Sequence, residues 1–191
     1  MGDLRDKLEK ELKELPRHYI VMLVTDSEKY QDANQNALKL LMESGDSEGI
    51  YVTFNRPYET LMVSLAKEKI DVDRLYFLDL ITQTTGKRGE RTENCIFLPS
   101  PRNLTELSIA LTQLVERMGD TQGDRFIFMD SLSTMLIYNS AGTVAQFTHF
   151  LVSKMRIWNV GMIMVSMEKE SDQKLISDLS QFCDKVIRIT K

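Results

Sequence analysis

Seven short apolar runs recur along the chain, with segments of helical periodicity between them. The clearest are IVMLVT at 20–25, RFIFMD at 125–130 and VGMIMVS at 160–166. Continuous apolar character is typical of parallel strands buried on both faces. The alternation of strands and helices therefore predicts an α/β fold, a mainly parallel sheet covered by helices on both faces. Strands are expected at 18–25, 49–54, 74–79, 94–98, 125–130, 160–166 and 185–190, and helices at 31–44, 57–68, 103–118, 143–158 and 171–181.

Residues 1–16 precede the alternating strands and helices and are expected to form a unit of their own. Residues 1–16 predict an amphipathic helix that ends at Pro16, and residues 17–191 predict the α/β domain. One stripe of the helix carries Leu4, Leu8, Leu12 and Leu15. We expect this stripe to pack on the domain; a self-association seam is the alternative, because leucines at this spacing also occupy coiled-coil positions.

Composition excludes several classes of protein. A net charge of −4 over 191 residues argues against a nucleic-acid partner, which needs clustered Lys and Arg to neutralise phosphates. No segment approaches the roughly 20 apolar residues of a membrane span, and the N-terminus has no apolar signal region. The two cysteines, Cys95 and Cys183, form no CxxC pair. These features predict a cytoplasmic protein without a membrane partner.

Five segments, taken in their order along the chain, resemble the segments of RecA/KaiC-like P-loop ATPases. The resemblance covers about residues 18–190. The segment RFIFMDSLSTMLIYN resembles the Walker B strand, with Asp130 after four apolar residues. The other four are GIYVTFNRPYETL, LYFLDLIT, VGMIMVSMEKE and CDKVIRI. The resemblance implies a RecA/KaiC-like fold with an added N-terminal helix.

The phosphate-binding loop of that family is missing. A Walker A loop needs glycines, so that backbone N–H groups can surround the phosphates, and a lysine that reaches the outer oxygens. The corresponding stretch has no glycine and reads Asp26, Ser27, Glu28, Lys29, Tyr30, Gln31 and Asp32. Aligned on Ala37 and Leu38, the family's lysine position falls on Asp32 or Ala33. A carboxylate there would repel a triphosphate by roughly 4 kcal/mol at about 4 Å and an effective dielectric of about 20.

Catalytic groups are missing as well. The resemblance implies an acidic residue after the Thr-Phe of the second strand, but this chain has Asn55 and Arg56, neither of which is a general base near neutral pH. Asp130 and Asp79 remain at strand ends, where we expect each carboxylate to accept hydrogen bonds from hydroxyl or N–H groups. A weak anion site at the helix start after the first strand stays open as an alternative. We expect no cofactor and no metal site, since His18 and His149 lack neighbouring ligands.

Together these losses predict a catalytically inactive RecA/KaiC-like domain, a pseudo-ATPase that acts as a protein-interaction or regulatory module. Its partner would be another protein, a second copy of the chain or a paralogous ATPase. The alternative is a nucleotide or small-molecule binder with weak ATPase-type activity at the carboxyl ends of the strands, where ligands bind in open parallel sheets. Candidate partner contacts are Arg56, Tyr58, Lys87, Arg88, Arg91 and Tyr138.

Overall fold

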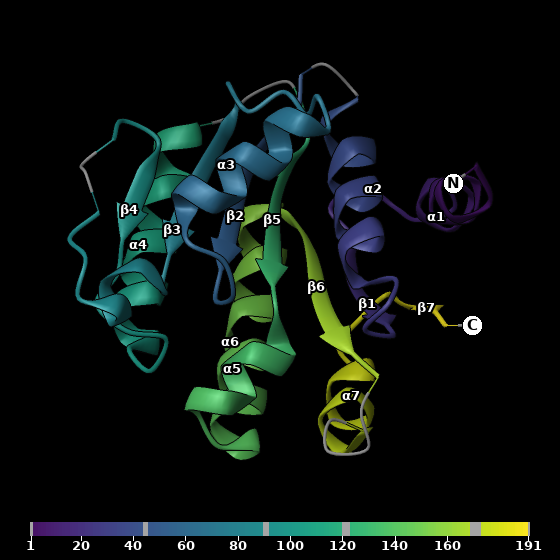
Figure 1. Cartoon of the computed structure of the whole chain (residues 1–191). Coiled ribbons are helices and arrows are strands. Elements are labelled where there is room, and N and C mark those ends of the chain that lie inside the picture. The colour runs from purple at the N-terminus through teal and green to yellow at the C-terminus, as the bar shows by residue number, and fades with distance from the viewer. Residues whose placement is uncertain (1, 44–45, 90–91, 120–122, 169–172, 191) are drawn as a thin grey trace.

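A seven-stranded sheet forms the centre of the computed structural model, which describes residues 2–43, 46–89, 92–119, 123–168 and 173–190. The strand order is β4-β3-β2-β5-β6-β1-β7, and every neighbouring pair is parallel (Figure 1). The predicted α/β fold is therefore confirmed. The strands are β1 (Ile20–Thr25), β2 (Glu48–Thr53), β3 (Leu75–Asp79), β4 (Cys95–Phe97), β5 (Arg125–Asp130), β6 (Gly161–Met167) and β7 (Lys185–Ile189).

Helices cover both faces of this sheet. The elements α1, α2 and α3 pack on one face, and α4, α5, α6 and α7 pack on the other. Asn103 is the N-cap of α4, and its side chain accepts a hydrogen bond from the Glu106 N–H. The helices are α1 (Gly2–Lys13), α2 (Tyr30–Met42), α3 (Tyr58–Lys67), α4 (Leu104–Met118), α5 (Leu132–Tyr138), α6 (Ala141–Trp158) and α7 (Gln173–Ser180), with a short 3₁₀ helix η1 (Thr82–Thr85).

Two apolar cores follow from this layering. In β1 the side chains of Met22 and Val24 point into the core beneath α4 to α7, whereas Val21 and Leu23 point into the core beneath α1 to α3. All four are at most 1% exposed. Successive side chains of a strand alternate between faces, so a strand buried on both sides has to be apolar at every position.

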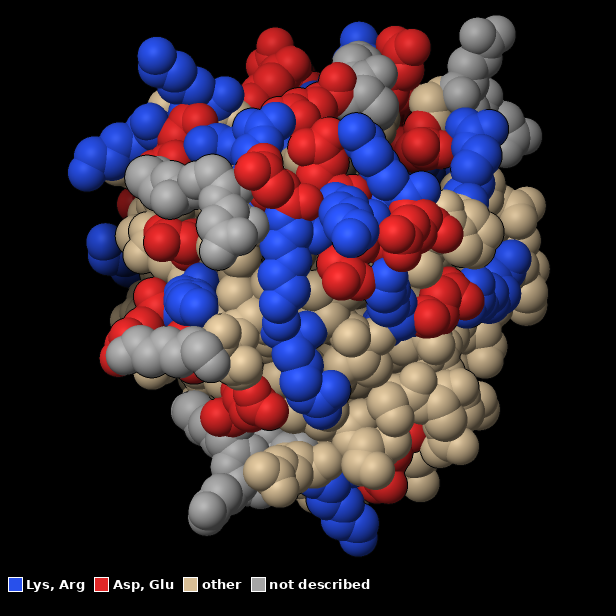
Figure 2. All heavy atoms as spheres, turned by 90° about the vertical axis from the view of Figure 1, so that its right-hand side faces the viewer, with Lys and Arg blue, Asp and Glu red and all other residues tan. Residues whose placement is uncertain are grey.

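The N-terminal helix packs on the domain, as predicted. Leu8 and Leu12 are buried against α2 and the sheet, and Leu4 and Leu15 are partly buried beside them. Salt bridges join the helix to its neighbours, including Arg5 to Glu43 at 2.6 Å and Lys185 to Glu11 at 2.6 Å. Figure 2 shows this side of the molecule, where acidic and basic side chains intermingle. The leucine stripe therefore faces the domain's own core, and its alternative use as a self-association seam would require α1 to detach.

The segment after β5 differs from the sequence-based expectation. No helix was expected between 118 and 143, but residues Leu132–Tyr138 form the helix α5 and Tyr138 is its last residue. The segment contains Ser, Thr and Ile, which have modest helix propensity, and this explains the missed helix. Its start is stabilised by Ser131, whose side-chain oxygen accepts a hydrogen bond from the Thr134 N–H.

Candidate functional site

Four residues, Asp26 to Lys29, connect β1 to α2 where a P-loop ATPase would carry its phosphate-binding loop. The Asp26 carboxylate accepts a hydrogen bond from the Lys29 N–H at 2.9 Å, and the Lys29 ammonium donates to the Thr190 carbonyl at 3.1 Å. A carboxylate therefore already occupies the helix start that the sequence analysis left open as a weak anion site. An incoming anion would have to displace Asp26 or approach its negative charge.

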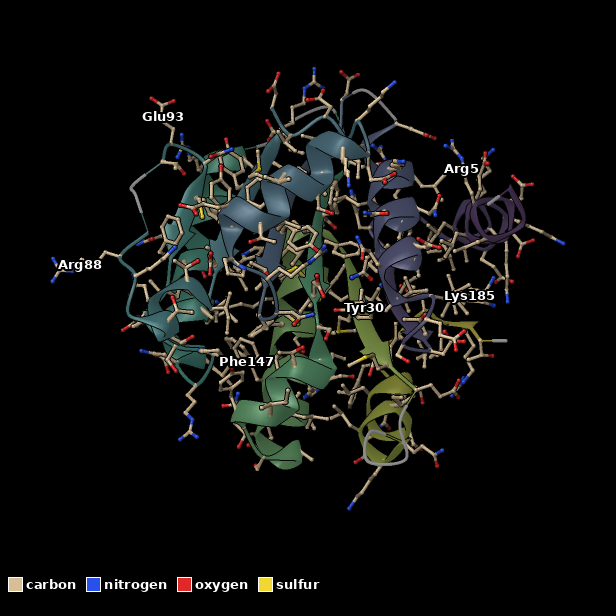
Figure 3. The ribbon with its side chains drawn as sticks, in the orientation of Figure 1. Arg5, Tyr30, Arg88, Glu93, Phe147 and Lys185 are labelled. Atoms are coloured by element: carbon tan, nitrogen blue, oxygen red, sulfur yellow. The ribbon has the colours of Figure 1, made fainter. Side chains whose placement is uncertain are left out.

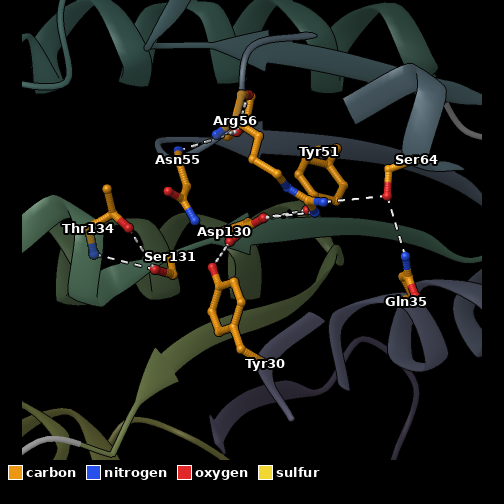
Figure 4. A network of polar contacts seen from close by, with 10 residues as sticks. Tyr30, Gln35, Tyr51, Asn55, Arg56, Ser64, Asp130, Ser131 and Thr134 are labelled. Atoms are coloured by element: carbon orange, nitrogen blue, oxygen red, sulfur yellow. Dashed lines mark hydrogen bonds and ion pairs between the residues drawn. The ribbon is translucent and has the colours of Figure 1, made fainter. Parts of the chain in front are cut away.

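Tyr30, the first residue of α2, points into the molecule toward the end of β5 (Figure 3). Its hydroxyl donates a hydrogen bond to one carboxylate oxygen of Asp130. The Tyr51 hydroxyl, from β2, donates to the other carboxylate oxygen at 2.6 Å (Figure 4). Asp130 is 0% exposed. Two tyrosines from different elements thus cover the Walker-B-like carboxylate and satisfy both of its oxygens.

Arg56 supplies the positive charge of this cluster. Its Nη2 lies 3.7 Å from the Asp130 carboxylate, and its Nη1 donates to the Ser64 hydroxyl at 3.5 Å. Ser64 also accepts a 3.4 Å hydrogen bond from the Gln35 amide of α2. Figure 4 shows the resulting chain of contacts, which links α2, α3 and the end of β5. We call Tyr30, Tyr51, Arg56 and Asp130 the strand-end cluster.

The phenols of the strand-end cluster stay protonated. Burial first, and then the neighbouring Asp130 carboxylate, raise the pKa of Tyr30 and the pKa of Tyr51 far above that of a free phenol. Protonated phenols are the hydrogen-bond donors that a buried carboxylate requires. The negative charge of Asp130 is therefore compensated inside the protein by Arg56 and by the two phenol hydrogen bonds. Neither carboxylate oxygen of Asp130 faces solvent.

Some polar atoms beside the cluster have no partner in the described part of the chain. Asn34, one turn after Tyr30 on the buried side of α2, is 3% exposed, and neither its Nδ2 nor its Oδ1 makes a well-formed hydrogen bond, although the Tyr30 phenol lies close to it. The Nε of Arg56 is also buried without a partner. Buried polar groups are usually paired with protein or ordered water. Sequence reasoning missed Asn34 and Tyr51, although a polar residue within a buried helix face or an apolar strand is a usable signal.

Asp79, at the end of β3, has a different set of partners. Its carboxylate accepts hydrogen bonds from the N–H groups of Tyr58, Ile81 and Thr82 and from the Thr82 hydroxyl, at 2.5 to 2.8 Å. These contacts fix the start of α3 and the turn into η1. Asp79 thus has the hydrogen-bonding environment that the sequence analysis expects of a strand-end carboxylate.

The other residues at the position of the missing P-loop lie in the β1–α2 connection and in the first turn of α2. Ser27, Glu28, Gln31 and Asp32 are exposed, and Ala33 is buried. The resemblance puts the family's lysine position at Asp32 or Ala33, and the nearby side chain that bonds to Asp130 is that of Tyr30. The helix α2 begins at Tyr30, so Tyr30, Asp32 and Ala33 all lie in its first turn.

The partner-contact candidates divide into inward and outward groups. Arg56 belongs to the strand-end cluster, and Tyr58 packs its ring against Phe77 and Phe97. Lys87 and Arg88 are exposed, and Arg88 points away from the body of the molecule (Figure 3). Arg91 lies outside the described residues. The outward pair remains available to a partner, and the contact roles of all six candidates stay predictions.

Two negative findings hold for residues 2–43, 46–89, 92–119, 123–168 and 173–190. In those ranges no three His, Cys, Asp or Glu side chains are placed to hold a metal ion. No helix there is both long enough and apolar enough to cross a bilayer.

Comparison with known proteins assigns the chain to a protein family. A family model described as a family of unknown function, DUF7504, matches residues 21–189. The chain belongs to DUF7504. In this DUF7504 chain the match runs from Val21, the second residue of β1, to Ile189, the last residue of β7. No curated protein matches the chain.

Two solved structures from Pyrococcus horikoshii resemble the DUF7504 chain. One is the KaiC-like protein PH0186, with a TM-score of 0.65, 13% identity, and coverage of 92% of this chain and 73% of that one. The other is the uncharacterised protein PH0321, solved with an unknown peptide, with a TM-score of 0.67, 12% identity, and coverage of 96% and 82%. At such identities the likeness concerns the fold alone, and it supports the RecA/KaiC-like architecture.

Proposed function

We propose that this DUF7504 chain is a catalytically inactive RecA/KaiC-like domain that acts through protein contacts. The observation that carries the proposal is the covering of Asp130 by Tyr30 and Tyr51. In an active relative this carboxylate would face a hydrated Mg²⁺ beside the phosphates. Here both carboxylate oxygens are engaged by phenols of the same chain.

Charge supports the same proposal. Arg56 places a guanidinium 3.7 Å from Asp130, so the chain carries its own cation beside the carboxylate. A magnesium ion entering this space would meet a fixed positive charge, and a triphosphate would meet the carboxylate of Asp26 at the start of α2. Neither group of a magnesium–nucleotide complex has a complementary position.

Titration calorimetry with ATP and Mg²⁺ tests the inactive character directly. We expect no binding heat and no phosphate release at millimolar nucleotide. A Tyr30→Ala variant is the informative companion, because it uncovers Asp130 without altering Asp26. Micromolar affinity or turnover in the unmodified protein would overturn the proposal.

The second part of the proposal is that the domain binds another protein. Lys87 and Arg88 are exposed next to the start of α3, on a protein of net charge −4. The fold neighbour PH0321 was solved in complex with a peptide, which makes a peptide or protein partner a reasonable class to test. Light scattering of the chain alone, and of the chain mixed with a candidate ATPase subunit, distinguishes self-association from a mixed assembly. A Lys87→Glu, Arg88→Glu double variant should weaken an association that uses this loop.

A second candidate function rests on the unpartnered atoms of Asn34 and Arg56. These donors and this acceptor would suit a small uncharged polar molecule bound beside the strand-end cluster. The calorimetric experiment separates the two candidates when it is repeated with a neutral nucleoside. Saturable heat that an Asn34→Leu variant abolishes would favour the ligand-binding function.

A further inference from the structure

The helix α6 carries an exposed stripe without a charged side chain. Thr143, Gln146, Phe150, Ser153 and Ile157 recur at alternating intervals of three and four residues, so they lie along one side of the helix. All five are exposed, and the large apolar side chains of Phe150 and Ile157 are 45% and 78% exposed. We call these five residues the α6 stripe. The helix lies on the opposite side of the sheet from α2 and α3 (Figure 1).

The lack of charge extends beyond the α6 stripe. Residues 131–153 contain no Asp, Glu, Lys or Arg, although these types make up 27% of the chain. Lys154, the next charged residue, is held against the protein: its ammonium donates to the Thr112 hydroxyl at 3.1 Å and lies 5.0 Å from the centre of the Phe150 ring. Exposed helix faces normally carry charged residues, whereas the core of a protein–protein interface is depleted of them and enriched in aromatic residues. The α6 stripe has the composition of an interface core.

Charge favours a second copy of the chain as the partner. Two molecules that each carry a net charge of −4 repel one another, so they approach most readily through surfaces free of charge. The α6 stripe is such a surface, and pairing it with itself places no like charges of the stripe opposite one another. A strongly acidic or basic partner would find no counter-charge on it.

The spacing of the α6 stripe is self-complementary. In two antiparallel copies of α6, related by a two-fold axis beside Ser153, residue 150 of one helix lies opposite residue 157 of the other. Phe150 of each copy then packs on Ile157 of the other copy, and the small side chain of Ser153 lets the helices approach closely. The Ser153 hydroxyl already donates to the His149 carbonyl at 3.0 Å, so its burial leaves no unsatisfied donor.

We propose that the α6 stripe is the contact surface of a homodimer, in which α6 pairs antiparallel with α6 of a second copy about a two-fold axis at Ser153. The proposal rests on the part of the proposed function in which the domain acts through protein contacts. It does not rest on the inactive character of the strand-end cluster, with which the stripe shares no residue. ATP binding in the calorimetric experiment would therefore overturn the inactive domain and leave the dimer standing.

Sedimentation equilibrium at micromolar to millimolar chain concentration tests the dimer. We expect a monomer–dimer equilibrium that Phe150→Asp and Ile157→Asp each weaken about tenfold or more, because each substitution puts two carboxylates into the apolar contact. Val63→Asp, at a 70% exposed position of α3, is the matched control and should leave the equilibrium unchanged. Thermal unfolding verifies that all three variants are folded.

Cysteine cross-linking tests the position of the axis. In Ser153→Cys the two introduced thiols lie near the axis, and the oxidant diamide should convert them to a disulfide-linked dimer. In Gln146→Cys, on the same stripe, the thiols lie about 20 Å apart at a rise of 1.5 Å per residue and should stay unlinked. The parent chain, with its own Cys95 and Cys183, measures the background.

Three results would each overturn the proposal. The first is a chain that stays monomeric at every concentration. The second is a Phe150→Asp variant that dimerises as the parent does. The third is a Ser153→Cys variant that cross-links no better than Gln146→Cys.

Discussion

The Tyr51 hydroxyl, in β2, donates a 2.6 Å hydrogen bond to the Asp130 carboxylate at the end of the neighbouring strand β5. The register of the two strands pairs Tyr51 with Phe128 and Thr53 with Asp130, so the phenol reaches two residues along the sheet. Tyr30 completes the arrangement from α2. Both oxygens of this buried carboxylate are thus engaged by phenols of the same chain.

Replacing Tyr30 with Phe should reduce the free energy of unfolding by about 1.5 to 3 kcal/mol, the usual contribution of a hydrogen bond to a charged group. The phenyl ring keeps the packing, and one Asp130 oxygen loses its donor. Urea unfolding measures the change. Tyr58→Phe is the matched control: the Tyr58 hydroxyl donates to the neutral amide oxygen of Asn94, and its loss should cost about 0.5 to 1.5 kcal/mol. Equal losses in the two variants would contradict a charged role for Asp130.

Asp184 should make stability depend on pH. Burial alone would raise the pKa of this carboxyl, but hydrogen bonds from Arg156 and from the Ile20 N–H, both at 2.7 Å, outweigh it and lower the pKa. A lowered carboxyl pKa contributes stability that is present above the unfolded pKa and is lost as pH falls through the folded pKa. Asp184→Asn should therefore be less stable than the parent at pH 7, by about 1 kcal/mol.

The difference between Asp184→Asn and the parent should shrink as the solution is acidified below pH 4, where the parent's carboxyl also becomes neutral. Urea unfolding at a series of pH values measures it. A difference that stays constant from neutral to acid pH would mean that the ion pair with Arg156 adds nothing to stability.

Gly49, in β2, should not tolerate a side chain. A Cβ at this position would lie 2.2 Å from the Phe126 ring and 2.8 Å from the Leu75 side chain. Gly49→Ala should therefore destabilise the protein by about 1 to 3 kcal/mol through overpacking. In Gly142→Ala, near the start of α6, the nearest atom to the Cβ is 4.0 Å away, and helix propensity should stabilise the protein by up to about 1 kcal/mol. Thermal unfolding should give shifts of opposite sign.

Substitution of Leu8 tests how much the packing of α1 contributes to the free energy of unfolding. It is 1% exposed, so Leu8→Ala should cost about 2 to 4 kcal/mol in urea unfolding. Val63→Ala, at a 70% exposed position, should change stability by less than about 0.5 kcal/mol. If Leu8→Ala were neutral for unfolding but changed the molecular mass seen by light scattering, the leucine stripe would serve association instead.

Sequence periodicity was enough to predict the sheet, most of the helices and the packing of α1, because burial on two faces requires apolar residues at every position of a strand. The resemblance to the RecA/KaiC-like ATPases, and not periodicity, pointed to the stretch Asp26–Asp32 and to Asp130. It could not identify Tyr51 as a partner of Asp130, because the two residues are 79 positions apart and meet only through the register of β2 against β5.

The sequence by itself thus determined the α/β layering and the absence of a glycine-rich loop, since both depend on which residue types follow one another. Only the tertiary structure decided that Tyr30, Tyr51 and Arg56 converge on one carboxylate. Hydrogen bonds act over about 3 Å, so their partners depend on where helices and strands end in space, and local sequence does not specify those positions.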